Sequence, residues 1–262
     1  MTQLFGSSHG VSIERSRDGV ATVTLDRPGT LNALTFDGYR ALRDAFRGFA
    51  KEPEVRAVVL AGAGEGFCSG GDREEIVAAL PDMSSDEILA FTRLTGDTVL
   101  AMRELEKPII AAVGGAAVGA GAVLALAADL RVASERARFG FVFAKLGLSG
   151  ADMGAAWLLP RMVGMARATE LLMLGHVIDG DIANKFGLIN YYVPHDDLAT
   201  TARVLAAKLA SGPAEAHAVT KRMLNREAHL DLAAAIEAEA QAQAQCLQTE
   251  GFRRAARKLR KS

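Results

Sequence analysis

The stretch from Pro108 to Val132 constrains the fold more than any other part of the chain. Residues 109–113 form an apolar run of strand length, and Gly114 and Gly115 interrupt it. Residues 120–128 are small, apolar and uninterrupted, which is typical of a helix that is buried on all sides. The sequence therefore predicts a strand, a glycine turn and a buried helix in direct succession.

The start of this predicted helix is suited to meeting an anion. The first N–H groups of a helix have no partner within it, and they lie at the positive end of the helix dipole. Gly119, Ala120 and Gly121 stand at this start, so no large side chain keeps a ligand away. A dinucleotide-binding turn is the alternative, but Leu124 occupies its third glycine position and no acidic residue ends a following strand.

The same order of elements occurs once more, upstream. Residues 55–61 read as a buried strand that leads into a glycine-rich loop ending in Gly66–Asp72 (GFCSGGD), with a helix predicted over 73–80. A hairpin around Arg17–Gly19 and a helix from Leu34 to about Ala50 precede it. The remaining elements are predicted as a helix ending near 105, strands at 130–133 and 138–143, and helices at 156–174, 181–186, 198–211, 213–229 and 232–248. The pattern predicts an α/β core over residues 1–197 and a helical region over 198–262.

The net charge and the composition limit the kinds of partner that we expect for this chain. The 262 residues carry a formal net charge of -1, which gives no electrostatic reason to expect nucleic acid or a membrane as a partner. Only two cysteines occur, Cys68 and Cys246, and this fits a reducing, cytoplasmic compartment. The five histidines are scattered without ligand spacing, so we expect no metal site.

Four segments, in order, resemble the crotonase (enoyl-CoA hydratase/isomerase) superfamily. They are VTLDRPGTLNAL at 23–34, VVLAGAGEGFCSGGD at 58–72, KPIIAAVGGAAVGAGAVLALAADLRVA at 107–133 and GLSGADMGAAWLLPRMVGMARATELLMLG at 147–175. The resemblance covers nearly the whole chain. It implies a spiral of ββα units and a C-terminal helical region that assembles a homotrimer or a hexamer. It also implies an acyl-CoA substrate, with coenzyme A as part of that substrate and no separate cofactor.

The resemblance also implies particular site residues. The family's oxyanion hole, two backbone N–H groups that hold a thioester oxygen, falls on Gly71 and Ala120. Small residues suit this task because a side chain would crowd the approach to the developing charge. Cys68, Ser69 and Gly70 are expected to line the coenzyme A site through their backbone. Arg27 and Lys221 are expected to meet its phosphates. A basic C-terminal cluster is either a solvated helix end or a further phosphate contact across a subunit boundary, and it consists of Arg253, Arg254, Arg257, Lys258, Arg260 and Lys261.

The proton chemistry is expected to differ from that of the usual hydratase. The two glutamates that activate water in hydratases of this family match Val123 and Phe143 here, and neither side chain can move a proton. Asp152 is the leading candidate, since it matches an aspartate of the ring-epoxide isomerases and the nucleophilic aspartate of aroyl-CoA dehalogenases. Its flanking glycine, alanine and methionine residues favour a desolvated carboxyl with a raised pKa.

Other roles stay open at this point. Asp152 is alternatively an N-cap for the helix that begins near Gly154. Glu74 or Glu75 could face the acyl pocket, Asp72 is expected to cap a helix, and Asp129 is expected to be a structural acid. The sequence thus predicts an isomerase, hydratase or hydrolase acting on an unsaturated or ring-derived acyl-CoA, with Asp152 as base or nucleophile. The alternative is a non-catalytic acyl-CoA-binding member of the superfamily.

Overall fold

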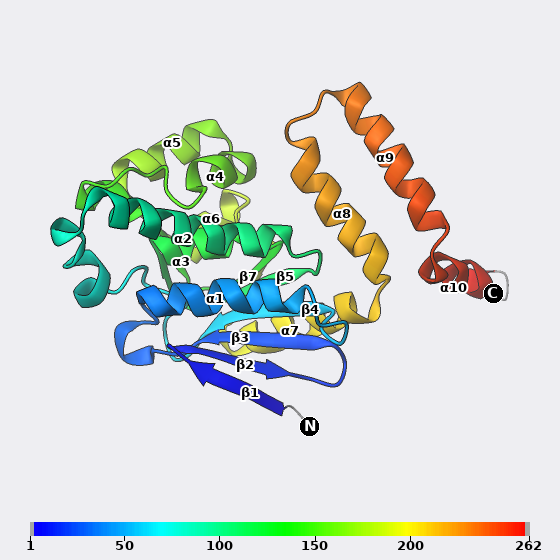
Figure 1. The fold of residues 1–262 in the computed structure, drawn as a ribbon, viewed down its shortest axis with the longest axis horizontal. Coiled ribbons are helices and arrows are strands. Elements are labelled where there is room, and N and C mark those ends of the chain that lie inside the picture. Colours follow the sequence, from blue (N-terminus) through cyan, green and yellow to red (C-terminus); the bar gives the residue numbers. More distant parts are fainter. Residues whose placement is uncertain (1–2, 260–262) are drawn as a thin grey trace.

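A seven-stranded sheet forms the centre of the molecule in a computed structural model, which describes residues 3–259 (Figure 1). The spatial order is β1-β2-β3-β4-β5-β7-β10, with β1 to β3 antiparallel and the pairs from β3 to β10 parallel. The strands are β1 (Gln3–Ser8), β2 (Val11–Arg15), β3 (Val20–Leu25), β4 (Ala57–Gly62), β5 (Ile109–Val113), β7 (Leu130–Ser134) and β10 (Tyr191–Val193). The predicted hairpin at Arg17–Gly19 is confirmed as β2 and β3, whereas β1 was not predicted.

A second, three-stranded sheet continues the chain after the glycine turn. It consists of β6 (Ala116–Val118), β8 (Arg138–Gly140) and β9 (Val177–Asp179), and β6 runs parallel to β8. The strand predicted over 138–143 is therefore too long, because residues 142–146 form a 3-10 helix. This small sheet sets the direction in which the chain enters the buried helix.

Helices cover both faces of the large sheet (Figure 1). On one face lie α1 (Phe36–Phe49), α2 (Ser85–Glu104) and α3 (Ala120–Ala127), and on the other lies α7 (Leu198–Ser211). The central strand β4 shows the reason, since Val58 and Leu60 are buried with the first group while Ala57 and Val59 are buried under α7. Alternate residues of a parallel strand point to opposite faces, so both faces need an apolar cover.

The structure confirms the predicted buried helix but not two of the other predicted helices. All eight residues of α3 are buried, as predicted. The single helix predicted over 156–174 is wrong, because Gly164, with φ at 82°, separates α4 (Ala155–Val163) from α5 (Met165–Leu174). The helix predicted over 73–80 is also wrong. A π-helical turn (Arg73–Val77) and a 3-10 turn (Leu80–Asp82) form there instead. The helix predicted over 181–186 is confirmed as α6 (Gly180–Lys185).

The last three helices form the C-terminal part of the chain and are α8 (Ala214–Glu227), α9 (Leu232–Leu247) and α10 (Glu250–Leu259). In this part α8 is bonded to the body of the molecule through Lys221 and Asn225, while α9 and α10 lie farther out (Figure 1). The helix α9 packs against α8 through Met223, Ala238 and Ala242. Large apolar side chains on this part of the chain are exposed to solvent, namely Leu224, Leu232, Ile236, Leu247, Phe252 and Leu259. Across residues 3–259, no helix combines the length and the apolar character that crossing a membrane requires.

Candidate active site

Backbone hydrogen bonds lock the two glycine-rich segments together. The N–H groups of Phe67 and Cys68 donate to the carbonyl of Ala116 at 3.0 and 2.8 Å, and the N–H of Val118 donates to the carbonyl of Cys68 at 2.9 Å. The N–H of Leu34 in turn donates to the carbonyl of Gly70 at 2.8 Å. The loop that ends in Gly71 is therefore fixed on both sides, to β6 and to the start of α1.

Two glycines allow the loop before Gly71 to lie close to the N-terminus of α3. A Cβ atom on Gly121 would lie 2.0 Å from the carbonyl oxygen of Cys68, so only glycine fits there. At Gly70 the backbone has φ at 103°, which favours glycine, and a Cβ atom would lie 3.0 Å from the carbonyl oxygen of Val118 and 3.7 Å from the nitrogen of Ala120. The loop before Gly71 thus lies directly against the N-terminus of α3.

The N–H groups of Gly71 and Ala120 are brought to this junction. Among the residues that the structure describes, neither group donates a hydrogen bond to a protein acceptor. The N–H of Asp72, which follows Gly71, donates to the carbonyl of Leu34, and the N–H of Gly119, which precedes Ala120, donates to the carbonyl of Gly140. Two free donors beside one another at a helix start can hold a developing negative charge on an oxygen.

Asp72 anchors the turn that follows Gly71. Its carboxylate accepts from the N–H groups of Glu74 and Glu75 at 3.0 Å each and from the guanidinium of Arg27 at 2.7 Å. These hydrogen bonds, with that from Glu75 the largest cause, hold the pKa of Asp72 below its ordinary value. The predicted role of Asp72 as a helix cap is confirmed. Arg27 also donates to the carbonyl of Ala33 at 2.7 Å, so it holds the loop together.

Asp152 is half-buried in the turn before α4. Burial raises the pKa of its carboxyl, and a hydrogen bond from the N–H of Met153 offsets part of that rise. The carboxyl does not cap α4: Gly154 occupies the N-cap position and no side chain caps this helix. The alternative that Asp152 is an N-cap is therefore wrong, and its side chain is free of that structural task.

Tyr39 of α1 is a buried titratable residue. Its pKa is raised first by burial of the phenol and further by electrostatic interaction with Asp152. The sequence placed Tyr39 only on the buried face of α1, because helical spacing shows burial and gives no information on contacts across the fold.

Other acids lie in less suitable places. Glu74 and Glu75 are exposed to solvent, and a carboxylate oxygen of Glu75 accepts from the N–H of Phe36 at 2.8 Å, at the start of α1. Asp129 accepts from the N–H of Ile109 and from Lys221, both at 2.8 Å, so it is the structural acid that was predicted. None of these three carboxylates combines burial with a free position.

The side chains of Cys68 and Ser69 are turned to structural contacts. Burial raises the pKa of the Cys68 thiol to about 12, so it does not form a thiolate at neutral pH. The hydroxyl of Ser69 donates to the carbonyl of Thr30 at 2.9 Å. Val123 and Phe143 are buried apolar side chains.

Lys221 has a structural position that the sequence did not reveal. Its ammonium group is buried and donates to the carbonyls of Met102 and Lys107 at 3.0 and 3.2 Å and to Asp129 at 2.8 Å. All three of its protons are thus taken, and none is left for a phosphate of coenzyme A. Of the basic C-terminal cluster, Arg257 pairs with Glu250 on the surface of α10, and Arg260 and Lys261 lie outside the described residues.

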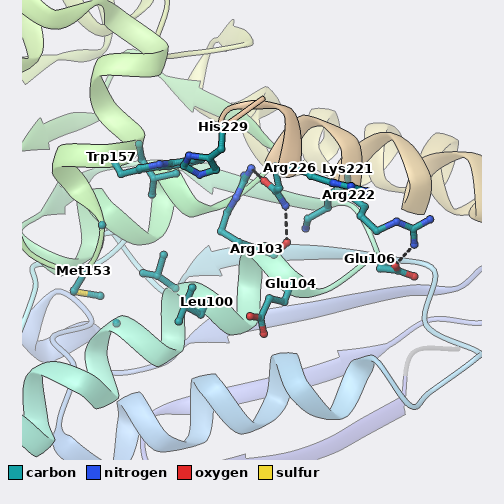
Figure 2. A pocket seen from close by; sticks show the side chains of 15 residues that line it. Leu100, Arg103, Glu104, Glu106, Met153, Trp157, Lys221, Arg222, Arg226 and His229 are labelled. Carbon is teal, nitrogen blue, oxygen red and sulfur yellow. Dashed lines mark hydrogen bonds and ion pairs between the residues drawn. The ribbon is translucent and has the colours of Figure 1, made fainter. Parts of the chain in front are cut away.

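A cavity of about 780 Å³ lies between α2, α4 and α8 (Figure 2). Residues of these three helices line it, together with Met153 and Gly154 from the turn after Asp152. Gly71, Ala120 and Asp152 are not part of its lining. Its volume is within the range of about 300–1,000 Å³ that is usual for small-molecule pockets.

Known proteins are similar to this chain in sequence and in fold. The profile of the Enoyl-CoA hydratase/isomerase family matches residues 15–260. The chain is 38% identical over 218 residues to the probable enoyl-CoA hydratase echA12 of Mycobacterium leprae (strain TN), covering 82% of this chain and 74% of that protein. It is 37% identical over 207 residues to the 1,2-epoxyphenylacetyl-CoA isomerase of Escherichia coli (strain K12), covering 79% of each.

Solved structures agree with these sequence matches. A Streptomyces coelicolor A3(2) protein with a provisional enoyl-CoA hydratase assignment superposes with a TM-score of 0.90 at 51% identity, over 93% of this chain and 88% of that one. The α/β fold of ββα units with C-terminal helices, expected from the resemblance, is confirmed. The chain therefore belongs to the enoyl-CoA hydratase/isomerase (crotonase) family and is an acyl-CoA enzyme.

Proposed function

We propose that this enzyme acts on an unsaturated or ring-derived acyl-CoA through a thioester enolate, with Asp152 moving the proton. The proposal is supported by the pair of unpaired N–H groups at Gly71 and Ala120 and by the half-buried carboxyl of Asp152, whose pKa is raised by burial. A raised pKa makes the carboxylate of Asp152 a stronger base than an ordinary aspartate, which favours uptake of a proton during the reaction. No other described acid near the junction has both properties.

The reaction step follows from this arrangement. The Asp152 carboxylate takes a proton from the carbon next to the thioester carbonyl, or from the carbon just beyond a C=C bond that is conjugated with that carbonyl. The electron pair of the broken C–H bond moves to the thioester oxygen, which accepts hydrogen bonds from Gly71 and Ala120. Return of the proton to a different carbon shifts the double bond. Two such donors can lower the barrier by about 3 kcal/mol each.

An isomerase fits this single carboxylate better than a simple hydratase. Hydration by the usual pair of glutamates needs two acids, and Val123 and Phe143 occupy the matched positions. The similarity to a 1,2-epoxyphenylacetyl-CoA isomerase supports the same choice. In the second candidate mechanism the Asp152 carboxylate attacks the thioester carbonyl carbon, the C–S bond breaks and coenzyme A leaves as its thiolate. Water then hydrolyses the resulting acyl–aspartate anhydride, which releases the carboxylic acid and restores Asp152.

The coenzyme A part is proposed to lie along the Cys68–Ser69–Gly70 backbone and near Arg27. Arg27 lies at the edge of this loop and is partly exposed, so one of its faces can meet a phosphate. Lys221 is left out of this proposal, since its protons are already taken. A phosphate contact from the C-terminal cluster would require a second subunit.

We propose that the enzyme is a homotrimer or a dimer of trimers. The exposed apolar side chains of α8 to α10, such as Leu232 at 77% and Ile236 at 55% exposure, need a cover that the chain itself does not provide. Light scattering at micromolar protein should give three or six times the mass of the chain. A monomer under these conditions would contradict the proposal.

A panel of acyl-CoA esters in deuterated water tests the function directly. The wild-type enzyme should place deuterium on the acyl group of its substrate, detected by mass spectrometry, because the enolate takes its proton from a base that exchanges with solvent. Double-bond migration in the same sample identifies an isomerase. Binding of esters without exchange or product would favour the non-catalytic alternative, and a stable mass increase of the protein would favour the covalent mechanism.

A further inference from the structure

The hydrogen bond from Leu34 to Gly70 sets the direction of the N–H of Gly71. The carbonyl of Gly70 and the N–H of Gly71 belong to one planar trans peptide unit, so they point in opposite directions. The N–H of Leu34 holds this carbonyl at 2.8 Å, and the carbonyl of Leu34 accepts from the N–H of Asp72 at 2.8 Å. The N–H of Gly71 is therefore turned away from Leu34, and the segment that ends in Leu34 controls where this donor points.

Asn32 is the buried centre of that segment, residues 27–34, which we call the strap. It is only 1% exposed, and its backbone is left-handed with φ at 60°, a conformation that asparagine adopts more readily than most residues other than glycine. Its N–H donates to the carbonyl of Arg27, and its Oδ1 accepts from the N–H of Arg27, both at 2.9 Å. These two hydrogen bonds close the strap into a compact turn.

The amide group of Asn32 also bonds the strap to the loop that follows β4. Its Nδ2 donates to the carbonyls of Ala63 and Gly66, both at 2.8 Å. The three partners of the side chain are thus one N–H donor and two carbonyl acceptors, and together they fix the orientation of the amide. Among side chains of this size only asparagine offers one acceptor and two donors, so the position requires this residue.

The loop has little space in which to move. A Cβ atom on Gly66 would lie 3.1 Å from the Cβ atom of Leu31 in the strap, and a Cβ atom on Gly115, just before β6, would lie 1.8 Å from the carbonyl oxygen of Glu65. Without the donors of Asn32, the buried carbonyl of Gly66 would lose this partner at a cost in free energy. A shift of the loop against the strap would relieve that cost.

We propose that Asn32 is a positioning residue for the oxyanion hole. Its side chain fixes the strap against the loop, and the strap in turn holds the peptide unit that directs the N–H of Gly71. The inference rests on the proposed function, because it takes this N–H as one of the two donors to the thioester oxygen. Asn32 is buried and acts only through Leu34 and the backbone of the loop.

Asn32→Asp isolates the two hydrogen bonds to the loop. Aspartate keeps the size of the side chain, tolerates the left-handed backbone and retains an oxygen that accepts from Arg27. Its carboxylate cannot donate to Ala63 and Gly66, and it repels their carbonyl oxygens. On the best ester of the acyl-CoA panel, kcat should fall about 10²-fold or more, as for a misplaced oxyanion donor, while KM changes by less than about threefold.

Asn190 provides the matched control. Its N–H donates to the carbonyl of Arg131 at 3.0 Å, and its Oδ1 accepts from the N–H of Arg131 at 2.9 Å, so it repeats the two bonds of Asn32 with Arg27. It is exposed and directly precedes β10, the edge strand of the large sheet. Asn190→Asp should therefore keep the wild-type kcat and KM.

Infrared spectroscopy separates a positioning role from a loss of folding. The saturated ester of the panel that binds best is labelled with ¹³C at its thioester carbonyl, and its stretching frequency is measured free and bound at saturation. Hydrogen bonds to the carbonyl oxygen lower this frequency, so the wild type should lower it and Asn32→Asp should lose at least about half of that shift. If urea unfolding shows that Asn32→Asp does not fold, Asn32→Gly decides in the same measurement, because glycine accepts the left-handed backbone and adds no charge.

The outcomes distinguish this inference from the proposed function. An unshifted carbonyl frequency in the wild type would contradict the oxyanion hole and therefore the proposed function itself. A wild-type shift that the folded Asn32 variant retains in full would overturn only the positioning role, whatever its turnover. A folded variant with wild-type kcat would overturn it as well.

Discussion

Replacing Gly121 with alanine tests whether the contact between the two glycine segments sets the oxyanion hole. The new Cβ atom would lie 2.0 Å from the carbonyl oxygen of Cys68 and 2.8 Å from its Cβ atom. Non-bonded heavy atoms prefer separations of about 3.5 Å. The loop carrying Gly71 and the start of α3 must therefore separate by more than about 1 Å, and the hydrogen bond from Val118 to Cys68 is weakened.

The size of the effect follows from this displacement. Forcing an extra methyl group into a packed contact costs about 1–3 kcal/mol of unfolding free energy. A shift of about 1 Å in a catalytic group costs about 10²-fold in rate, and loss of one oxyanion donor costs about 10²–10³-fold. Gly121→Ala should therefore lower kcat by about 10²-fold or more while the protein stays folded.

Kinetics on the best ester of the panel, together with urea unfolding, provide the assay. The control is Gly48→Ala in α1, where the added Cβ atom finds only a carboxylate oxygen of Glu52 at 4.0 Å. That variant should keep full turnover and gain up to about 1 kcal/mol, since alanine favours a helix over glycine. A folded Gly121→Ala variant with wild-type turnover would refute the argument that this contact positions the donors.

Three further predictions concern single side chains. Because burial raises the pKa of Asp152, the contribution of Asp152 to the free energy of unfolding should fall as pH rises from its unfolded pKa of about 3.9 through the higher folded pKa. Urea melts of Asp152→Asn at several pH values should lack this fall. Lys221→Met should cost about 3 kcal/mol of unfolding free energy, because Asp129 loses its closest cation, whereas Arg222→Met on the surface should cost less than about 1 kcal/mol. Equal losses in the two variants would contradict the role of the buried Lys221–Asp129 pair. An alkylating reagent at pH 8 should modify Cys246 but leave Cys68 intact in the folded protein, as peptide mapping would reveal, because the Cys68 thiol is buried with a pKa of about 12.

The sequence predicted the elements that depend on local pattern. The buried helix α3 and the strand β5 follow from uninterrupted small apolar residues, and the unpaired N–H at Ala120 follows from any helix start. The helix expected after Asp72 is limited to one turn, and a 3-10 turn that contains Pro81 follows it. Gly164 ended α4 because it takes a left-handed conformation, a choice that one glycine within a helical pattern does not reveal.

Contacts between distant residues could not be predicted from the sequence. Lys221 and Asp129 are 92 positions apart, so the ion pair that occupies Lys221 is visible only in the fold. The same holds for the electrostatic interaction of Tyr39 with Asp152, which depends on how α1 packs. Asp152 itself was found from a local motif, but its freedom from capping required the observed N-cap at Gly154.

The central claim, that Asp152 moves the proton, is tested most directly by Asp152→Asn. Asparagine keeps the size of the side chain but cannot act as the base, and it disturbs no helix cap because Gly154 holds that position. Deuterium exchange into the acyl group should fall about 10²–10⁴-fold, while calorimetry gives an unchanged Kd for the same ester. Exchange at the wild-type rate in this variant would contradict the account.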